Sequence, residues 1–143
     1  TRRAYYERHR LADVFVPLVR APERMEARLA EIPGVASAEG RISGSAQIDL
    51  SGEDLPLQAR IISLPENGEP QLNEIYLTDG RRLDEANPDE IILLKSFADA
   101  RGLLPGDALT LTIRGGQREF QIVGLARSPE FLRPSRASSA SCT

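Results

Sequence analysis

The chain has 143 residues, of which 41% are apolar and 27% are charged, so it is long enough to bury a core and has the composition of an ordinary globular protein. Its formal net charge of -3 argues against nucleic acid as a partner, and four Phe, three Tyr and no Trp leave little for base stacking. Cys142 is the only cysteine, which excludes an intrachain disulfide, a thiolate zinc cluster and a Cys-x-x-Cys redox pair.

The N-terminal segment, residues 1–11, is basic, with Arg2, Arg3, Arg8, His9 and Arg10. Such a segment is either a juxtamembrane or anion-binding stretch or a solvated end, and the abundance of arginine throughout the chain favours the solvated end. It lacks the apolar stretch of a secretion signal, and no apolar run in the chain approaches the roughly 18 to 20 residues of a membrane helix. The sequence therefore predicts a soluble chain, or a soluble piece of a larger one.

A strand followed by a helix is predicted next. Residues 12–19, ADVFVPLV, are apolar and rich in β-formers, and Pro17 confines them to a sheet edge or ends the strand early. A helix is expected to open near Pro22 and to stop before Pro33. Its apolar face is narrow, so we expect this helix to lie on a sheet with its other side exposed; the face consists of Met25, Leu29 and Ile32.

Residues 42–50 and 55–63 predict a β-hairpin. Apolar and polar side chains alternate in both segments, and the polar residues 51–54 between them are typical of a turn. The apolar side chains that share one side of each strand are Ile42, Ala46, Ile48 and Leu50 in the first and Leu55, Leu57, Ala59 and Ile61 in the second.

The middle of the chain predicts short elements joined by loops. Residues 65–70, PENGEP, indicate a loop, and residues 72–77 indicate a short strand. Asp79-Gly80-Arg81 is typical of a turn. Residues 84–90, DEANPDE, then predict a polar acidic loop.

Residues 91–124 form the unit around which the rest of the chain is organised. Residues 91–94 are a short apolar run that suits a buried strand. Ser96 can cap a following helix, and Gly102 occupies the place where a helix end favours a left-handed residue.

The second half of this unit predicts a hairpin. Pro105-Gly106-Asp107 is turn chemistry, and residues 108–113 alternate as a half-buried strand does. Gly115-Gly116 signals a two-residue hairpin turn, after which Phe120 and Ile122 alternate on the returning strand. None of these side chains is chemically reactive, so the unit is a scaffold.

No catalytic or metal-binding constellation emerges. His9 is the only histidine, which leaves a histidine-based triad or metal site without further members. The acidic loop 84–90 lacks the spacing of a calcium loop, and Glu66 and Glu69 have no cleft for glycoside chemistry. Lys95 does not belong to a phosphate-binding loop. The sequence therefore predicts no catalytic residues, no metal and no cofactor.

An ordered set of motifs nevertheless resembles a known family, the extracytoplasmic domain of FtsX-like ABC transporter permeases, also called the MacB-type periplasmic core domain. The resemblance covers roughly residues 5–132. Each motif is weak alone, but their order is specific. They are DVFVPLVRAPE (13–23), IPGV (32–35), RIISLP (60–65), LNEIYLTDGR (72–81), EIILLKSFADARGLLPGD (90–107) and FQIVGLARSPEF (120–131).

The resemblance implies an α+β fold of mixed or antiparallel sheets with two or three short helices. It places residues 12–65 and 115–132 in a Porter-like main lobe and residues 66–114 in a smaller inserted lobe, all within a domain of residues 1–132. The family continues into a second membrane helix, whereas residues 133–143, RPSRASSASCT, do not. That segment is expected to be a disordered tail or sequence foreign to the native protein.

The function implied is that of a non-catalytic loop outside the membrane, in a periplasmic or extracytoplasmic location. It would transmit ATP-driven movements from a separate ATP-binding subunit and bind a partner protein or a lipid or peptide substrate, and the parent permease would be dimeric. Because they are expected to be exposed, the loop 65–71 and the following six residues are candidates for a partner surface: Asp84, Glu85, Asp89, Glu90, Phe131 and Leu132. A free-standing soluble binding or assembly module, or a hydrolase with an unusual site, are the alternatives.

Overall fold

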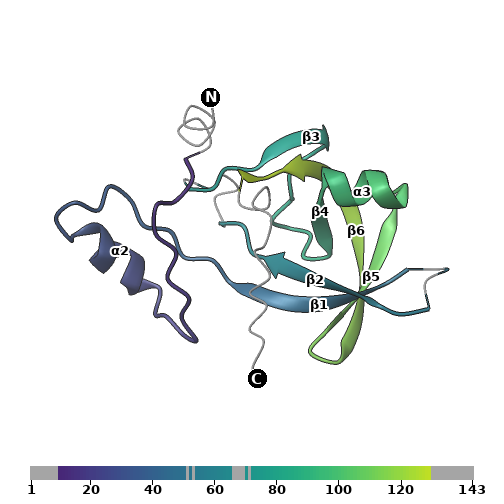
Figure 1. Ribbon diagram of the computed structural model, residues 1–143, viewed down its shortest axis with the longest axis horizontal. Helices are drawn as coiled ribbons and strands as arrows, with labels where there is room; N and C mark the ends of the chain where they lie inside the picture. The colour runs from purple at the N-terminus through teal and green to yellow at the C-terminus, as the bar shows by residue number, and fades with distance from the viewer. Residues whose placement is uncertain (1–9, 51, 53, 66–69, 71, 130–143) are drawn as a thin grey trace, which may run out of the picture.

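Six strands and two helices make up the regular structure in the described part of the chain. The computed structural model describes residues 10–50, 52, 54–65, 70 and 72–129 (Figure 1). In chain order the elements are α2 (Arg24–Ala30), β1 (Ser43–Asp49), β2 (Leu57–Ile62), β3 (Tyr76–Gly80), β4 (Glu90–Leu94), α3 (Lys95–Arg101), β5 (Ala108–Ile113) and β6 (Gly116–Arg127). The predicted α+β class is confirmed.

Strand β6 connects three of the other strands. Its first half pairs antiparallel with β5, from Gly116 opposite Ile113 to Gln121 opposite Ala108. Its second half pairs antiparallel with β3 and parallel with β4. β1 then joins β5 to β2, so the sheet has the order β2-β1-β5-β6-β3 with β4 also paired to β6. The sheet is therefore antiparallel apart from the β4–β6 pair.

The hairpin of β5 and β6 closes through a turn that forces two residues into the left-handed region. Arg114 has φ +50° and Gly115 has φ +82°, as primed hairpin turns require. The predicted hairpin is confirmed, but Gly116 already pairs with Ile113, so the turn lies one residue earlier than Gly115-Gly116.

The connection from β4 through α3 follows its glycine and turn signals. Gly102 ends α3 in the left-handed conformation with φ +67°, as predicted. The Asp107 carboxylate accepts a hydrogen bond of 2.8 Å from the Leu104 amide and stabilises the predicted turn. The prediction for Ser96 is wrong, because α3 begins directly after β4 at Lys95 and makes no side-chain cap.

The core lies between α3 and the strands that alternate apolar side chains. Ile122 and Leu125 of β6 are completely buried, as is Ala98 of α3, and each large aliphatic side chain buried this way contributes about 1.5–3 kcal/mol. Their buried neighbours are Ala46, Ile48, Leu109, Leu111 and Phe120. The hairpin predicted over residues 42–63 supplies one wall, with Ser43 opposite Ile62 and Ile48 opposite Leu57.

A network of hydrogen bonds around Asn73 attaches the segment that contains Arg10 and Ala12 to the chain just before β3. Asn73 is buried with φ +50°, its side-chain oxygen accepts a 2.9 Å hydrogen bond from the Ala12 amide, and its own amide donates to Arg10 O at 2.9 Å. Arg41 donates to the carbonyl of Leu72 and forms a 2.8 Å ion pair with Glu39. These contacts occupy backbone groups of Leu72 and Asn73, so β3 starts only at Tyr76, and the strand predicted at 72–77 is shifted.

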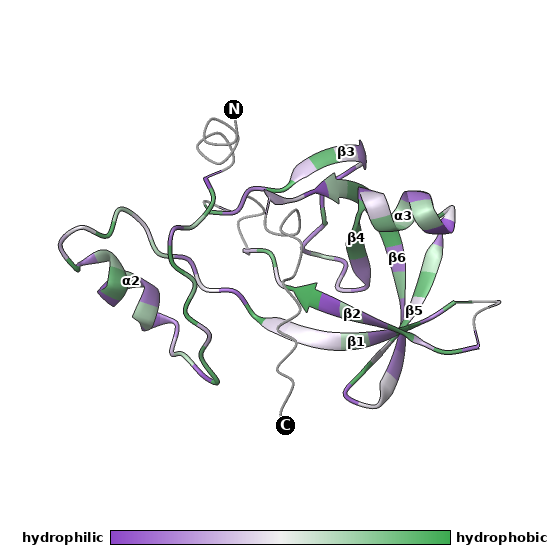
Figure 2. Ribbon diagram, viewed as in Figure 1, coloured by the Kyte–Doolittle hydropathy of each residue, from purple (hydrophilic) through white to green (hydrophobic). Residues whose placement is uncertain are grey.

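Residues 12–19 do not form the predicted strand. No described strand pairs with them, and Pro17 cannot donate a ladder hydrogen bond. Their apolar side chains are exposed, with 76% of Val14 and 69% of Val16 accessible. Figure 2 shows that the apolar colour continues along this segment, away from the sheet.

Helix α2 forms where it was predicted, but not on the sheet. It ends at Ala30, before Pro33, and contains no buried residue. Leu29 is 40% exposed and Ile32 is 49% exposed, because a face of three apolar side chains is too narrow to hold a short helix against a distant sheet. Figure 1 shows α2 at the opposite end of the molecule from α3.

Candidate functional site

The predicted acidic loop lies between β3 and β4. Asp84 organises it: its carboxylate oxygens accept hydrogen bonds of 3.0 Å each from the Ala86 amide and the Asn87 side chain, and its carbonyl accepts one of 2.9 Å from the Asn87 amide. This is the local turn chemistry that aspartate favours. The loop prediction is confirmed for residues 84–89, whereas Glu90 is the first residue of β4.

Arg81 and Glu90 close the base of this loop. The guanidinium meets both carboxylate oxygens, with Arg81 Nη1 2.9 Å from Glu90 Oε2, and the Asp84 amide donates to the same oxygen at 2.9 Å. The Glu90 side chain is only 6% exposed. The hydrogen bonds from Arg81 and then from the Asp84 amide lower the pKa of Glu90, and the same pairing raises the pKa of Arg81. The Glu90 carboxylate therefore holds the two ends of the loop together through Arg81 and the Asp84 amide.

Asp89 is also neutralised within the chain. Its carboxylate pairs with Arg118 Nε at 2.5 Å, and its carbonyl accepts a 2.8 Å hydrogen bond from the Gln121 amide of β6. Arg118 in turn lies 5.5 Å from the centre of the Phe120 ring. Asp84 and Glu85 are both exposed and have no ion pair to a described residue. The Asp84 carboxylate accepts the two loop hydrogen bonds given above, which leaves Glu85 as the predicted carboxylate without a hydrogen bond or an ion pair among the described residues.

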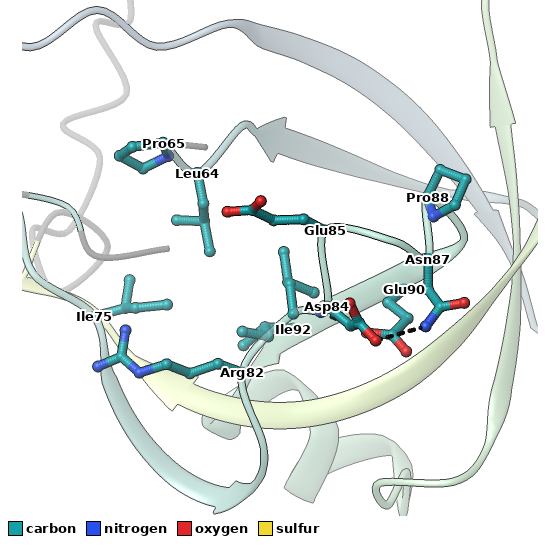
Figure 3. Close-up of a pocket in the computed structure, with 11 residues that line it drawn as sticks. Leu64, Pro65, Ile75, Arg82, Asp84, Glu85, Asn87, Pro88, Glu90 and Ile92 are labelled. Carbon is teal, nitrogen blue, oxygen red and sulfur yellow. Dashed lines mark hydrogen bonds between the residues drawn. The ribbon is translucent and has the colours of Figure 1, made fainter. Parts of the chain in front are cut away.

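An apolar cleft of about 470 Å³ adjoins the acidic loop (Figure 3). Ile92 of β4 and Ile75, just before β3, line it, and the segment that follows β2 approaches from the other side. Figure 3 shows the Glu85 side chain reaching over the cleft toward Leu64 and Pro65. The remaining lining residues are Arg82, Leu83, Asp84, Asn87, Pro88 and Glu90.

Alternation along β4 explains why the cleft is apolar. Ile91 and Leu93 pack against the main core, so Ile92 between them lies on the other face of the strand. The sequence predictions did not include this cleft. The uninterrupted apolar run 91–94 contained the signal, since a strand that is apolar on both faces needs a second apolar neighbour.

The other candidates do not join this site. Phe131, Leu132, Glu66, Glu69 and His9 lie outside the described residues, as does most of the loop 65–71. Within the described part of the chain, no three His, Cys, Asp or Glu side chains converge as metal ligands would. What the cleft offers is apolar surface beside three carboxylates, of which Glu90 is paired with Arg81, and such a surface can bind a ligand.

Comparison with known proteins adds no relationship: no family model matches this chain, and no curated protein matches it. Among the described residues, no helix is both long and apolar enough to cross a membrane.

Proposed function

We propose that the chain is a non-catalytic extracytoplasmic domain of an FtsX/MacB-like ABC transporter permease. It transmits conformational change driven by a separate ATP-binding subunit and binds a partner protein or a substrate outside the membrane, in a dimeric parent transporter. The observation that carries this proposal is the ordered set of six motifs between residues 13 and 131.

The conformation of the longest motif is consistent with a scaffold role. Residues 90–107 form β4, α3 and the following turn as one continuous unit. Gly102 ends the helix and Asp107 closes the turn, while Ile91, Leu93 and Ala98 pack in or against the core. These residues stabilise a shape and leave no reactive group, which suits a domain that transmits movement and binds.

The finer architecture is part of the same proposal. We assign residues 12–65 and 115–132 to a Porter-like main lobe and residues 66–114 to a smaller inserted lobe. Two strands of the main lobe would then join it to the smaller lobe, because β6 pairs with β3, β4 and β5 and β1 pairs with β5. Movement of the smaller lobe requires a second arrangement of these contacts.

A free-standing binding module is the second candidate. The apolar cleft beside Glu85 is compatible with it, since a binding surface serves a soluble module as well as a permease domain. The two candidates differ in what surrounds this segment in the parent gene and in where the domain is located.

Reporter fusions in the parent open reading frame separate the candidates. Alkaline phosphatase, which needs the oxidising periplasm for its disulfides, is inserted at the Arg114–Gly115 turn, and a cytoplasmic fluorescent protein is inserted there in parallel. A permease predicts phosphatase activity, an apolar stretch of about 20 residues before this segment and three more after it. Fluorescence without phosphatase activity, in a frame lacking such stretches, refutes the permease proposal.

A further inference from the structure

The second face of β4 is only partly covered. Ile92 and Ile75 are half-buried, and Leu83 at the rim is 37% exposed, although all three are apolar. The space between them measures about 470 Å³, within the range of about 300–1,000 Å³ that binding clefts span. A cleft of this size accommodates one or two large side chains of another molecule.

The charged side chains at the edge of the cleft determine which ligands it can bind. Glu90 is neutralised by Arg81 and Asp89 by Arg118. Arg82, on the opposite side, is engaged in an interaction of its own. The Asp84 carboxylate, also at the cleft, has no ion pair to a described residue and accepts hydrogen bonds from the Ala86 amide and the Asn87 side chain. Glu85 is therefore the carboxylate that no described residue engages, and it lies over an apolar floor (Figure 3). That combination attracts a cation attached to an apolar group while repelling anions.

We propose that this cleft is a docking site for a polypeptide segment in which an aliphatic or aromatic side chain lies next to arginine or lysine. The apolar side chain packs against Ile75 and Ile92, and the neighbouring cation pairs with Glu85. The proposal names the class of partner that the proposed function leaves open. It holds equally for the permease domain and for the free-standing module. It rests on the cleft and its charge, and not on the family resemblance.

A defined peptide tests the docking site on the 143-residue chain. The probe is fluorescein-labelled GRLFRG, followed by fluorescence polarisation, with GELFEG and GRSSRG as matched peptides. We expect GRLFRG to bind at least about tenfold more tightly than either, because each matched peptide removes one half of the recognition. Higher salt should weaken the binding of GRLFRG, since the contact with Glu85 is exposed to solvent.

Substitutions locate the site. Glu85→Gln is expected to raise the Kd about three- to fivefold, as loss of an exposed ion pair does, and Leu83→Ser removes an exposed part of the apolar rim. Glu31→Gln, at the end of α2, and Leu104→Ser, at an exposed leucine after α3, are the controls outside the cleft and should leave the Kd unchanged.

Several outcomes overturn the proposal. These are equal binding of GRLFRG and GELFEG, an unchanged Kd in Glu85→Gln, and amide chemical-shift changes that cluster away from Ile75, Glu85 and Ile92. Binding of dodecylamine without binding of GRLFRG also overturns it, because the occupant would then be a small cationic amphiphile. None of these results affects the phosphatase fusions, so the docking site and the proposed function fail independently.

Discussion

Gly80 lies directly opposite Gly124 in the β3–β6 pair, and neither position has room for a methyl group. A Cβ atom on Gly80, which has φ +74°, would overlap the carbonyl oxygen of Val123, and one on Gly124 would lie 2.5 Å from Arg81 O. This close approach brings the Arg81 amide within 2.9 Å of Val123 O and fixes the residue that clamps Glu90. The two glycines thereby connect sheet geometry to the shape of the acidic loop.

Gly124→Ala is therefore expected to lower the free energy of unfolding by about 1–3 kcal/mol, because two backbones must separate to admit the methyl group. Gly44→Ala is the matched control, since Gly44 is also in a strand but has open space at its Cβ position. Alanine there should be neutral or stabilising by up to about 1 kcal/mol. Urea unfolding of both variants measures the difference, and equal stabilities would contradict the packing argument.

The apolar core predicts a contrast between two leucines. Leu125 is completely buried in β6, whereas Leu104 is 63% exposed. Leu125→Ala should lower the unfolding free energy by about 2–5 kcal/mol through lost burial and the cavity left behind, and Leu104→Ala should change it by less than about 0.5 kcal/mol. Chemical denaturation measures both, and a small loss for Leu125→Ala would mean that β6 is not the centre of the core.

The Arg81–Glu90 pair predicts a pH dependence. Because the pKa of Glu90 is lowered in the folded state from its ordinary value of 4.5, the pair stabilises the fold above that value and loses its effect as the pH falls through the lowered pKa. Unfolding free energies of the wild type and Glu90→Gln should thus differ near neutral pH and converge in acid.

A second carboxylate, Asp79, also makes the unfolding free energy depend on pH. Hydrogen bonds from Thr78 and then Lys95 lower its pKa, so Asp79 also loses stabilising contacts in acid, but it does so in both proteins. Its contribution cancels when the two pH profiles are subtracted. If the difference in unfolding free energy between the wild type and Glu90→Gln stays constant across the acidic range, Glu90 stabilises the fold without its charge.

Asn73 predicts two separable effects. Asn73→Ala removes the acceptor for the Ala12 amide and places a less tolerant side chain at φ +50°, with an expected loss of about 2–3 kcal/mol. Asn73→Gly removes the same acceptor but tolerates the backbone, so it should cost less. Hydrogen exchange at Ala12 should accelerate in both variants, and unchanged exchange would place the anchor of the N-terminal segment elsewhere.

The exposed segment 12–19 predicts solubility effects without stability effects. Val14→Ser combined with Val16→Ser should change the unfolding free energy by less than about 0.5 kcal/mol, because both side chains already contact solvent. The variant should scatter less light at high concentration, since it shortens an exposed apolar stretch. Ile48→Ser, at a buried position of β1, is the comparison that should destabilise. A large loss of stability in the double variant would show that Val14 and Val16 pack against another part of the protein.

Local chemistry predicted the elements whose partners are close in sequence. The hairpins at 42–63 and 108–122 follow from alternation and from turn residues such as Gly115, and Gly102 and Asp107 fix the end of α3 and the next turn. The strand expected at 12–19 failed for the opposite reason. A run of apolar β-formers shows that a segment can pair, but pairing requires an available sheet edge, which depends on the rest of the fold.

The candidate site was predicted in composition but not in arrangement. A run of carboxylates at 84–90 is visible in the sequence, but which of them is neutralised depends on cations that lie elsewhere in the chain. Arg118 reaches Asp89 across 29 positions. The apolar cleft was missed because Leu64, Ile75 and Ile92 come from three segments that only the sheet brings together.

The position of β6 along the chain has a consequence for synthesis. Strands β3, β4 and β5 all pair with β6, yet β6 is the last of the six strands to leave the ribosome. Until the second half of β6 has emerged, the β1–β2, β1–β5 and β5–β6 pairs can form among the described strands, but β3 and β4 remain without their strand partner. At a synthesis rate of about 5–20 residues per second, this leaves the nascent chain exposed to aggregation and to chaperones for several seconds.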